Sequence, residues 1–119
     1  MIALGGLAGG VLSVSPAWSG TLENDARRAF RKIGIGPAQA EPYAQLYEEF
    51  LRNRNMQIRR VLNSRSGEEL PVIARKRALR AAKKSVKQMR DVLSEQQLEY
   101  YEQYLEIETK IYLREAGLR

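Results

Sequence analysis

The sequence VIARKRALRAAKKSVKQMRDVLSEQQLEYYEQYLEIETKIYL, residues 72–113, decides the fold of this chain. In its first half, apolar residues recur at alternating steps of three and four, apart from a gap that Arg75 fills, and this is helical periodicity. These residues are Val72, Leu79, Ala82, Val86, Met89 and Leu93. The opposite arc of a helical wheel carries a cationic strip from Arg75 to Arg90, without an acidic residue before Arg90. We therefore expect one face in the core and one cationic face.

The second half of this stretch is more apolar and more acidic. Its tyrosines, leucines and isoleucines cover about half of a helical wheel, so this helix is expected to contact more than one neighbour. Glu108 projects from the apolar arc and needs a partner, which we expect to be a cation on the preceding helix. The polar arc carries four carboxylates that are expected to pair with basic neighbours, namely Glu95, Glu99, Glu102 and Glu106.

The two halves meet at a helix start. Ser94 occupies an N-cap position and Gln97 follows three residues later, as in a capping box. We therefore predict that the chain turns between residues 92 and 97. The alternative is one long helix from Pro71 to Ala116, because neither glycine nor proline interrupts the segment.

A short helix is predicted before this stretch. Thr21 is a suitable N-cap for it, and the apolar side chains of residues 22–33 share one face. Basic residues gather near its end, where they complement the helix dipole. Gly34 and Gly36 then break the helix.

A longer helix follows, and Pro37 suits its first turn. Pro42 is expected to delay regular hydrogen bonding until after residue 41. The helix continues to about residue 62, residues 63–67 form a turn, and Pro71 fits the first turn of the next helix. One broad apolar face is expected to comprise Tyr43, Leu46, Tyr47, Phe50, Leu51, Ile58, Val61 and Leu62.

Length and composition narrow the function classes. With 119 residues the chain has room for a single core. It contains neither cysteine nor histidine, which removes thiol chemistry, the usual general base near neutral pH and the commonest metal ligands. We therefore expect no enzyme, no cofactor and no metal site. The net charge of +6 favours acidic or anionic partners.

Residues 1–19 form an apolar N-terminal segment rich in glycine and alanine. Its apolar run has the length of a signal-peptide core, and small residues near Pro16 suit cleavage. A basic n-region is missing, so either the true start lies upstream or the segment is a non-cleaved tail. We expect an exported protein without a stable membrane span, with residues 20–119 as a single helical domain.

Two segments repeat one pattern. Ile35-Gly36-Pro37-Ala38-Gln39 and Leu93-Ser94-Glu95-Gln96-Gln97 each consist of an aliphatic residue, a small residue, two variable residues and glutamine, followed by a long amphipathic helix. The aliphatic residue can anchor the entry to the helix, and the glutamine can return a hydrogen bond to the exposed backbone. We expect these motif residues, Ile35, Gln39, Leu93, Ser94 and Gln97, to shape the fold.

The pair of segments resembles the twin LTXXQ motif of the periplasmic Spy and CpxP family. This resemblance covers residues 21–116, with serine for threonine in the second copy and with isoleucine and glycine for leucine and threonine in the first. It implies an all-α bundle or hairpin of one short and three longer helices, often a curved homodimer. Metal handling by relatives in this family is not expected here, because the chain lacks histidine and cysteine.

The resemblance also implies a function. Spy-like members bind unfolded clients without ATP, and CpxP-like members inhibit an acidic sensor domain of an envelope-stress kinase through a basic surface. We therefore expect a periplasmic chaperone or stress modulator that binds unfolded or acidic clients. The candidate client-binding residues are Arg52, Arg54, Arg59, Arg60, Arg77, Arg80, Lys83, Lys84, Lys87 and Arg90.

Two other functions use the same features. A basic helix can lie along a phosphate backbone, so a nucleic-acid-binding protein is the main alternative, although no known binding motif supports it. A structural partner in an envelope complex is the other. The six tyrosines lie at helical spacing among aliphatic residues, which favours core and dimer contacts over base stacking.

Overall fold

The computed structural model describes residues 20–64 and 69–118. Four α-helices make up this part of the chain: α1 (Thr21–Ile33), α2 (Pro37–Ser64), α3 (Leu70–Gln88) and α4 (Glu95–Glu115). A short 3₁₀ helix, η2 (Met89–Asp91), follows α3. The predicted all-α bundle of one short and three longer helices is confirmed. The predicted apolar segment 1–19 lies outside the described residues.

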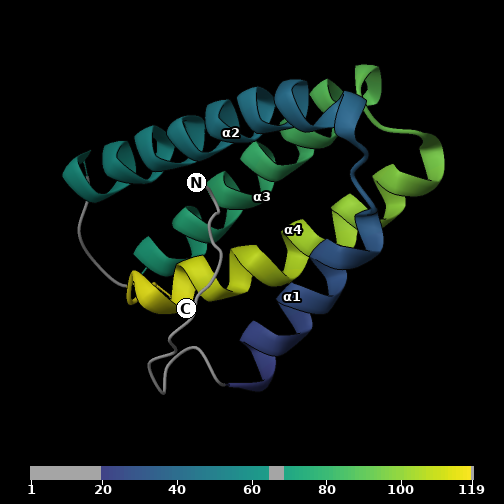
Figure 1. The fold of residues 1–119 in the computed structure, drawn as a ribbon. Helices are drawn as coiled ribbons and strands as arrows, with labels where there is room; N and C mark the ends of the chain where they lie inside the picture. Colours follow the sequence, from purple (N-terminus) through teal and green to yellow (C-terminus); the bar gives the residue numbers. More distant parts are fainter. Residues whose placement is uncertain (1–19, 65–68, 119) are drawn as a thin grey trace.

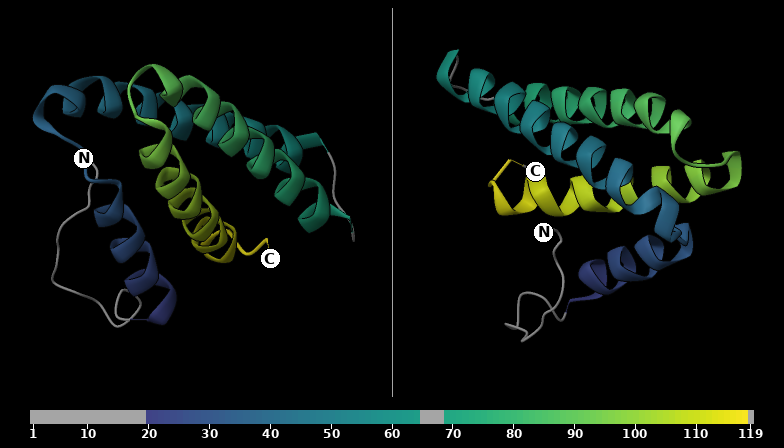
Figure 2. Two further views of the ribbon diagram at one scale, coloured as in Figure 1. Left: turned by 90° about the vertical axis from the view of Figure 1, so that its right-hand side faces the viewer. Right: turned by 45° about the horizontal axis from the view of Figure 1, so that its top comes forward.

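The helices form two pairs. α2 packs side by side with α3, and α1 packs against α4, while α3 also contacts α4 (Figure 1). Figure 2 shows the same arrangement from two further directions, with α2 and α3 in one layer and α1 and α4 in the other. Each pair is antiparallel, so the turns between α1 and α2 and between α3 and α4 meet at one end.

The helix boundaries follow local signals. α1 begins one residue earlier than predicted, with Gly20 as N-cap rather than Thr21, and it ends at Gly34, whose positive φ of 65° favours glycine. α2 begins at Pro37 and runs through Pro42 without interruption, so the predicted delay is wrong. Pro42 lies in the second turn, where the missing backbone hydrogen bond affects only the start of a long helix.

The predicted turn before α4 is confirmed. The 3₁₀ helix η2 ends α3, and Ser94 caps α4 with extended backbone angles, so the chain does not form one long helix. Pro71 occupies the first turn of α3, as predicted. The predicted turn at residues 63–67 lies largely outside the described residues.

The predicted apolar face is buried only in part: Met89 and Leu93 are buried as predicted, but the beginning and middle of α3 differ. The residues that pack inward are small, namely Ala74, Ala78, Ala81 and Ser85, whereas Val72 and Leu79 are 57% and 41% exposed. Small side chains allow α3 to lie close to α2, and large aliphatic side chains at these positions would hold the helices apart. Leu62 of α2 is also exposed, contrary to prediction.

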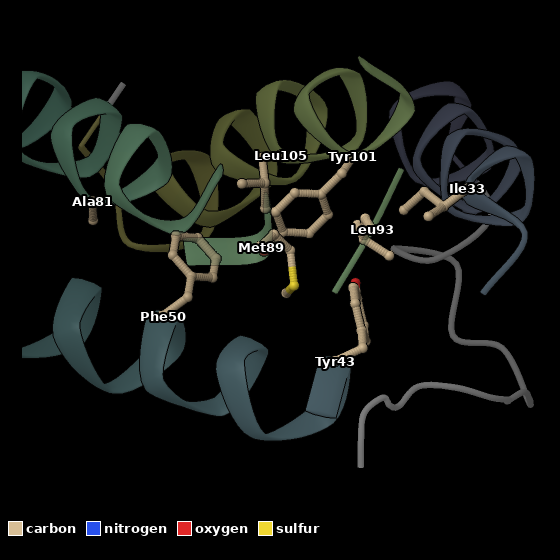
Figure 3. Close-up of a cluster of buried hydrophobic side chains, with 8 residues drawn as sticks. All are labelled: Ile33, Tyr43, Phe50, Ala81, Met89, Leu93, Tyr101 and Leu105. Atoms are coloured by element: carbon tan, nitrogen blue, oxygen red, sulfur yellow. The ribbon is translucent and has the colours of Figure 1, made fainter. Parts of the chain in front are cut away.

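The core consists of two clusters. The larger one lies near the paired turns and contains side chains from every helix (Figure 3). Its members are Ile33, Tyr43, Phe50, Ala81, Met89, Leu93, Tyr101 and Leu105. The smaller cluster lies toward the opposite end of the bundle and contains Ile58, Ala74, Ala78, Leu113 and Leu118.

Candidate client-binding surface

The two motifs lie together and form what we call the twin-motif junction. In the second copy the Ser94 hydroxyl accepts a hydrogen bond from the Gln97 backbone N–H at 3.2 Å, and Gln97 Oε1 accepts one from the Ser94 N–H at 2.9 Å. The predicted capping box is therefore confirmed. In the first copy Gln39 Oε1 accepts a hydrogen bond from the Gly36 N–H at 2.9 Å, so the glutamine makes the same return contact.

Each motif glutamine also bonds to the other motif. Gln39 Nε2 donates to Gln97 Oε1 at 2.8 Å and to the Val92 carbonyl at 2.9 Å. Gln97 Nε2 donates to Gln39 Oε1 at 3.0 Å and to the carbonyls of Ile33 and Gly34, each at 3.1 Å. Gly34 precedes Gln39 by as many residues as Val92 precedes Gln97, and each of these carbonyls accepts from the glutamine of the other motif. The junction is therefore close to two-fold symmetric. Carbonyls at the ends of two helices thereby gain partners.

The aliphatic residues of the motifs anchor this junction, as expected. Leu93 is 4% exposed and belongs to the larger core cluster, and Ile35 is half-buried against it. Ser94 is exposed. The motif residues therefore shape the fold. The one sequence signal for the pairing of Gln39 with Gln97 is that each follows the aliphatic residue of its motif at the same spacing. Periodicity alone could not identify the partner of either amide.

Arg54 is not part of the exposed cationic surface. Its side chain is 4% exposed, and its guanidinium donates to both carboxylate oxygens of Glu108, at 2.5 and 2.9 Å. The guanidinium also lies 3.8 Å from the ring centroid of Tyr112 and 4.9 Å from that of Phe50. The predicted partner of Glu108 on the preceding helix is therefore wrong, since the cation comes from α2. Arg54 is removed from the candidate client-binding residues.

The environment of this ion pair favours its charged form. Burial lowers the pKa of Arg54, but the hydrogen bond and the charge of Glu108 outweigh that effect and raise it. Breaking such a pair would leave one charge buried without compensation. Arg54 therefore links α2 to α4 and has a structural role.

Tyrosines fill the space between α2 and α4. Tyr43 and Tyr101 are buried, with ring centroids 5.8 Å apart, and the hydroxyls of Tyr47 and Tyr104 lie 3.1 Å apart. Burial raises the pKa values of Tyr43, Tyr47 and Tyr101, and it raises that of Tyr104 to about 12. These phenols pack in the core, in agreement with the sequence interpretation.

Eight of the ten candidate residues are exposed on α2, α3 and the turn that follows. Arg77 is half-buried and donates to Gln57 Oε1 at 3.0 Å, so it joins α3 to α2. Arg75 and Lys76 are also exposed. We define the cationic face as the exposed residues Arg52, Arg59, Arg60, Arg75, Lys76, Arg80, Lys83, Lys84, Lys87 and Arg90.

Aliphatic side chains accompany the cationic face. Met56 of α2 is 48% exposed, and Val72 and Leu79 of α3 are exposed as well. A groove of about 370 Å³ opens between α2 and α3, with Arg52, Met56 and Lys84 among its lining residues. The surface therefore combines positive charge with separate apolar contacts.

The acidic surface lies on another helix. Glu95, Glu99, Glu102 and Glu106 are exposed on α4 and form no ion pair with another residue of the described ranges 20–64 and 69–118. Their predicted pairing with basic neighbours is therefore wrong, because the cations of α3 lie on its outer side. On α3 every charged residue is a cation, whereas α4 carries this exposed row of carboxylates.

Metal-binding groups and membrane-spanning helices were looked for in the described part of the chain. Its acidic residues form no group of three or more that could hold a metal ion. None of the helices that the structure describes is long and apolar enough to cross a membrane. No protein-family model, curated protein or solved structure matches this chain.

Proposed function

We propose that this protein is an ATP-independent periplasmic chaperone or envelope-stress modulator that binds unfolded or acidic clients through the cationic face. The observation that carries the proposal is the composition of α3. Its outer side presents exposed cations and two exposed aliphatic side chains, and residues 70–88 contain no acid. The twin motif and its resemblance to the Spy and CpxP family support the same function.

The surface suits loose binding of many sequences. Like charges distributed along a helix attract acidic chains over a distance comparable to the Debye length, about 10 Å at moderate salt. Met56, Val72 and Leu79 then offer short-range contacts to exposed apolar segments of a client. Each contact is weak, so clients exchange readily and no nucleotide is needed to release them. We also expect the protein to form a homodimer.

The test is the aggregation of an acidic, chemically unfolded protein after dilution, with and without the purified chain, at low and high salt and without ATP. We expect suppression near stoichiometric amounts that weakens with salt. The variant Arg80→Glu, Lys83→Glu, Lys87→Glu should need roughly tenfold more protein for the same suppression. The matched control, Arg31→Glu, Lys32→Glu, Lys110→Glu, changes the net charge equally at exposed positions outside the cationic face.

Other outcomes would replace the proposal. If the unchanged chain does not suppress aggregation at any ratio, the proposal of a generalist chaperone is wrong. Tight binding of the chain to an isolated acidic sensor domain would then identify a stress modulator. If a labelled nucleic acid binds more tightly than the acidic client, the nucleic-acid-binding alternative is favoured. Stable one-to-one co-purification with one protein would indicate a structural partner.

A further inference from the structure

Two aliphatic side chains of α3 lie on its outer side, whereas Leu70, Ile73 and Val86 of the same helix are partly buried. Val72 and Leu79 are 57% and 41% exposed, while Ala74 and Ala78 on the inner side are fully buried. A helix on the surface of a globular protein usually has the opposite arrangement, with large apolar residues inward. The bundle itself therefore leaves this aliphatic area uncovered.

Cations alternate with these aliphatic residues along one line. Lys76 follows Val72 by one turn, and Lys83 follows Leu79 by one turn, so the four side chains share one side of α3. No acidic residue occurs among residues 70–88. A partner that forms one or two ion pairs would need cations only at its contact points. This side of α3 instead carries cations along its whole length and no acidic residue.

The neighbouring helix lies beside α3 in one layer (Figures 1 and 2). Met56, Arg59 and Arg60 of α2 are exposed, and Met56 lines the groove between the two helices together with Lys84 of α3. α3 alone is about 28 Å long at 1.5 Å per residue. Two adjacent helices of this length present a broad surface.

We propose that the outer side of α3, with the adjacent part of α2, docks on an anionic phospholipid bilayer. Val72 and Leu79 enter the boundary between headgroups and acyl chains, and the lysine and arginine side chains extend to the lipid phosphates. A bilayer matches the uniform charge, the breadth of the layer and the aliphatic rather than aromatic side chains. This inference goes beyond the proposed function, because it needs no client.

The experiment is co-sedimentation of the full chain with vesicles of phosphatidylcholine alone and of phosphatidylcholine mixed equally with phosphatidylglycerol. The double variant Val72→Ser, Leu79→Ser keeps every charge and alters only exposed side chains. We expect it to bind the anionic vesicles roughly tenfold more weakly. The control is Leu62→Ser, because the exposed fraction of Leu62 lies between those of Val72 and Leu79. Leu62 is about 120° around α2 from Met56, so it lies away from the proposed docking surface.

Binding to the anionic vesicles only, weakened by salt and by the double variant but not by the control, is the expected result. Equal sedimentation with both vesicle types, or anionic binding that the double variant leaves unchanged, would overturn the proposal. Circular dichroism checks that both variants keep their helices. Aggregation suppression without vesicles is measured in parallel, so that the chaperone function and membrane docking can fail separately.

Discussion

The two ends of the bundle are stabilised in different ways. The end with the twin-motif junction combines large buried side chains with five hydrogen bonds that join Gln39, Gln97 and three backbone carbonyls. The opposite end, around Leu113, packs alanine and aliphatic side chains and adds the ion pair between the buried Glu23 of α1 and Arg114 of α4. Amide hydrogen bonds therefore join the helices at the junction, whereas small apolar contacts and one ion pair join them at the opposite end.

The largest effect is expected at the Arg54–Glu108 ion pair, which links α2 to α4. Glu108→Ala leaves the buried guanidinium of Arg54 without a carboxylate, so we expect the free energy of unfolding to fall by about 3–5 kcal/mol. Replacing both residues, as Arg54→Met with Glu108→Leu, should restore most of this loss because no unpaired charge remains. Urea denaturation followed by circular dichroism measures both. A loss in the single variant no larger than in the double variant would show that the unpaired charge adds no penalty at this position.

A matched pair of leucines on α4 compares the ends directly. Leu105 is 1% exposed in the larger cluster and Leu113 is 6% exposed in the smaller one. We expect Leu105→Ala to cost about 3–5 kcal/mol and Leu113→Ala about 2–3 kcal/mol, since the cavity nearer the helix end can relax. Urea denaturation gives both values. Equal losses would remove the proposed difference in packing.

Alkaline pH should act mainly on the junction end, where the phenols with raised pKa values lie. Above pH 10 the unfolded chain releases its tyrosine protons while the folded chain retains them, so stability falls as pH rises toward 12. The buried phenols of Tyr43 and Tyr101 together contribute roughly 2–3 kcal/mol per pH unit. The urea midpoint measured between pH 10 and pH 12 tests this. Tyr101→Phe should reduce the slope, and an unchanged slope would contradict the assignment.

The amide pair makes a smaller contribution. Gln39→Ala and Gln97→Ala each leave polar groups of the junction without partners and should cost about 1–3 kcal/mol. The double variant should cost less than the sum, because both single variants break the same hydrogen bonds. Gln103→Ala, at an exposed position of α4, serves as control and should change stability by less than about 0.5 kcal/mol. Additive losses would show that the two amides act independently.

The smallest effects concern the caps of the two motifs. Ser94→Ala removes a side-chain cap and should cost about 1 kcal/mol. Gly36→Ser would give the first motif the same cap and should add a few tenths of a kcal/mol. The Cβ introduced at Gly36 meets only Gln39 Oε1, at 3.7 Å. Thermal unfolding measures both, and a stabilising effect of Ser94→Ala would refute the capping role.

Local sequence signals predicted the helices well. Ser94 with Gln97, Gly34 and Pro37 each marked a boundary that depends on the backbone of a few neighbouring residues. Interactions between distant residues were harder to infer. The Gln39 amide could be assigned to its own helix start, but its bond to Gln97 spans 58 residues and depends on how the helices cross.

The errors at the candidate surface have physical causes. Hydrophobic periodicity gave Val72 and Leu79 more weight than the alanines, yet close packing of α3 required the alanines inside. Arg54 was assigned to the surface because an isolated arginine costs too much to bury, and the carboxylate that offsets this cost lies 54 residues away. The exposed part of the cationic face was predictable because runs of cations rarely find enough buried partners.

The near-equivalence of the two motifs also bears on assembly. The side-chain amides of Gln39 and Gln97 each donate one hydrogen bond to the other and accept one from it. This reciprocal contact joins the first half of the chain to the second. Such a contact is satisfied equally when the two halves belong to different molecules. Exchange of halves between chains would then preserve every hydrogen bond of the junction, which makes domain swapping a route to a dimer at little cost in free energy.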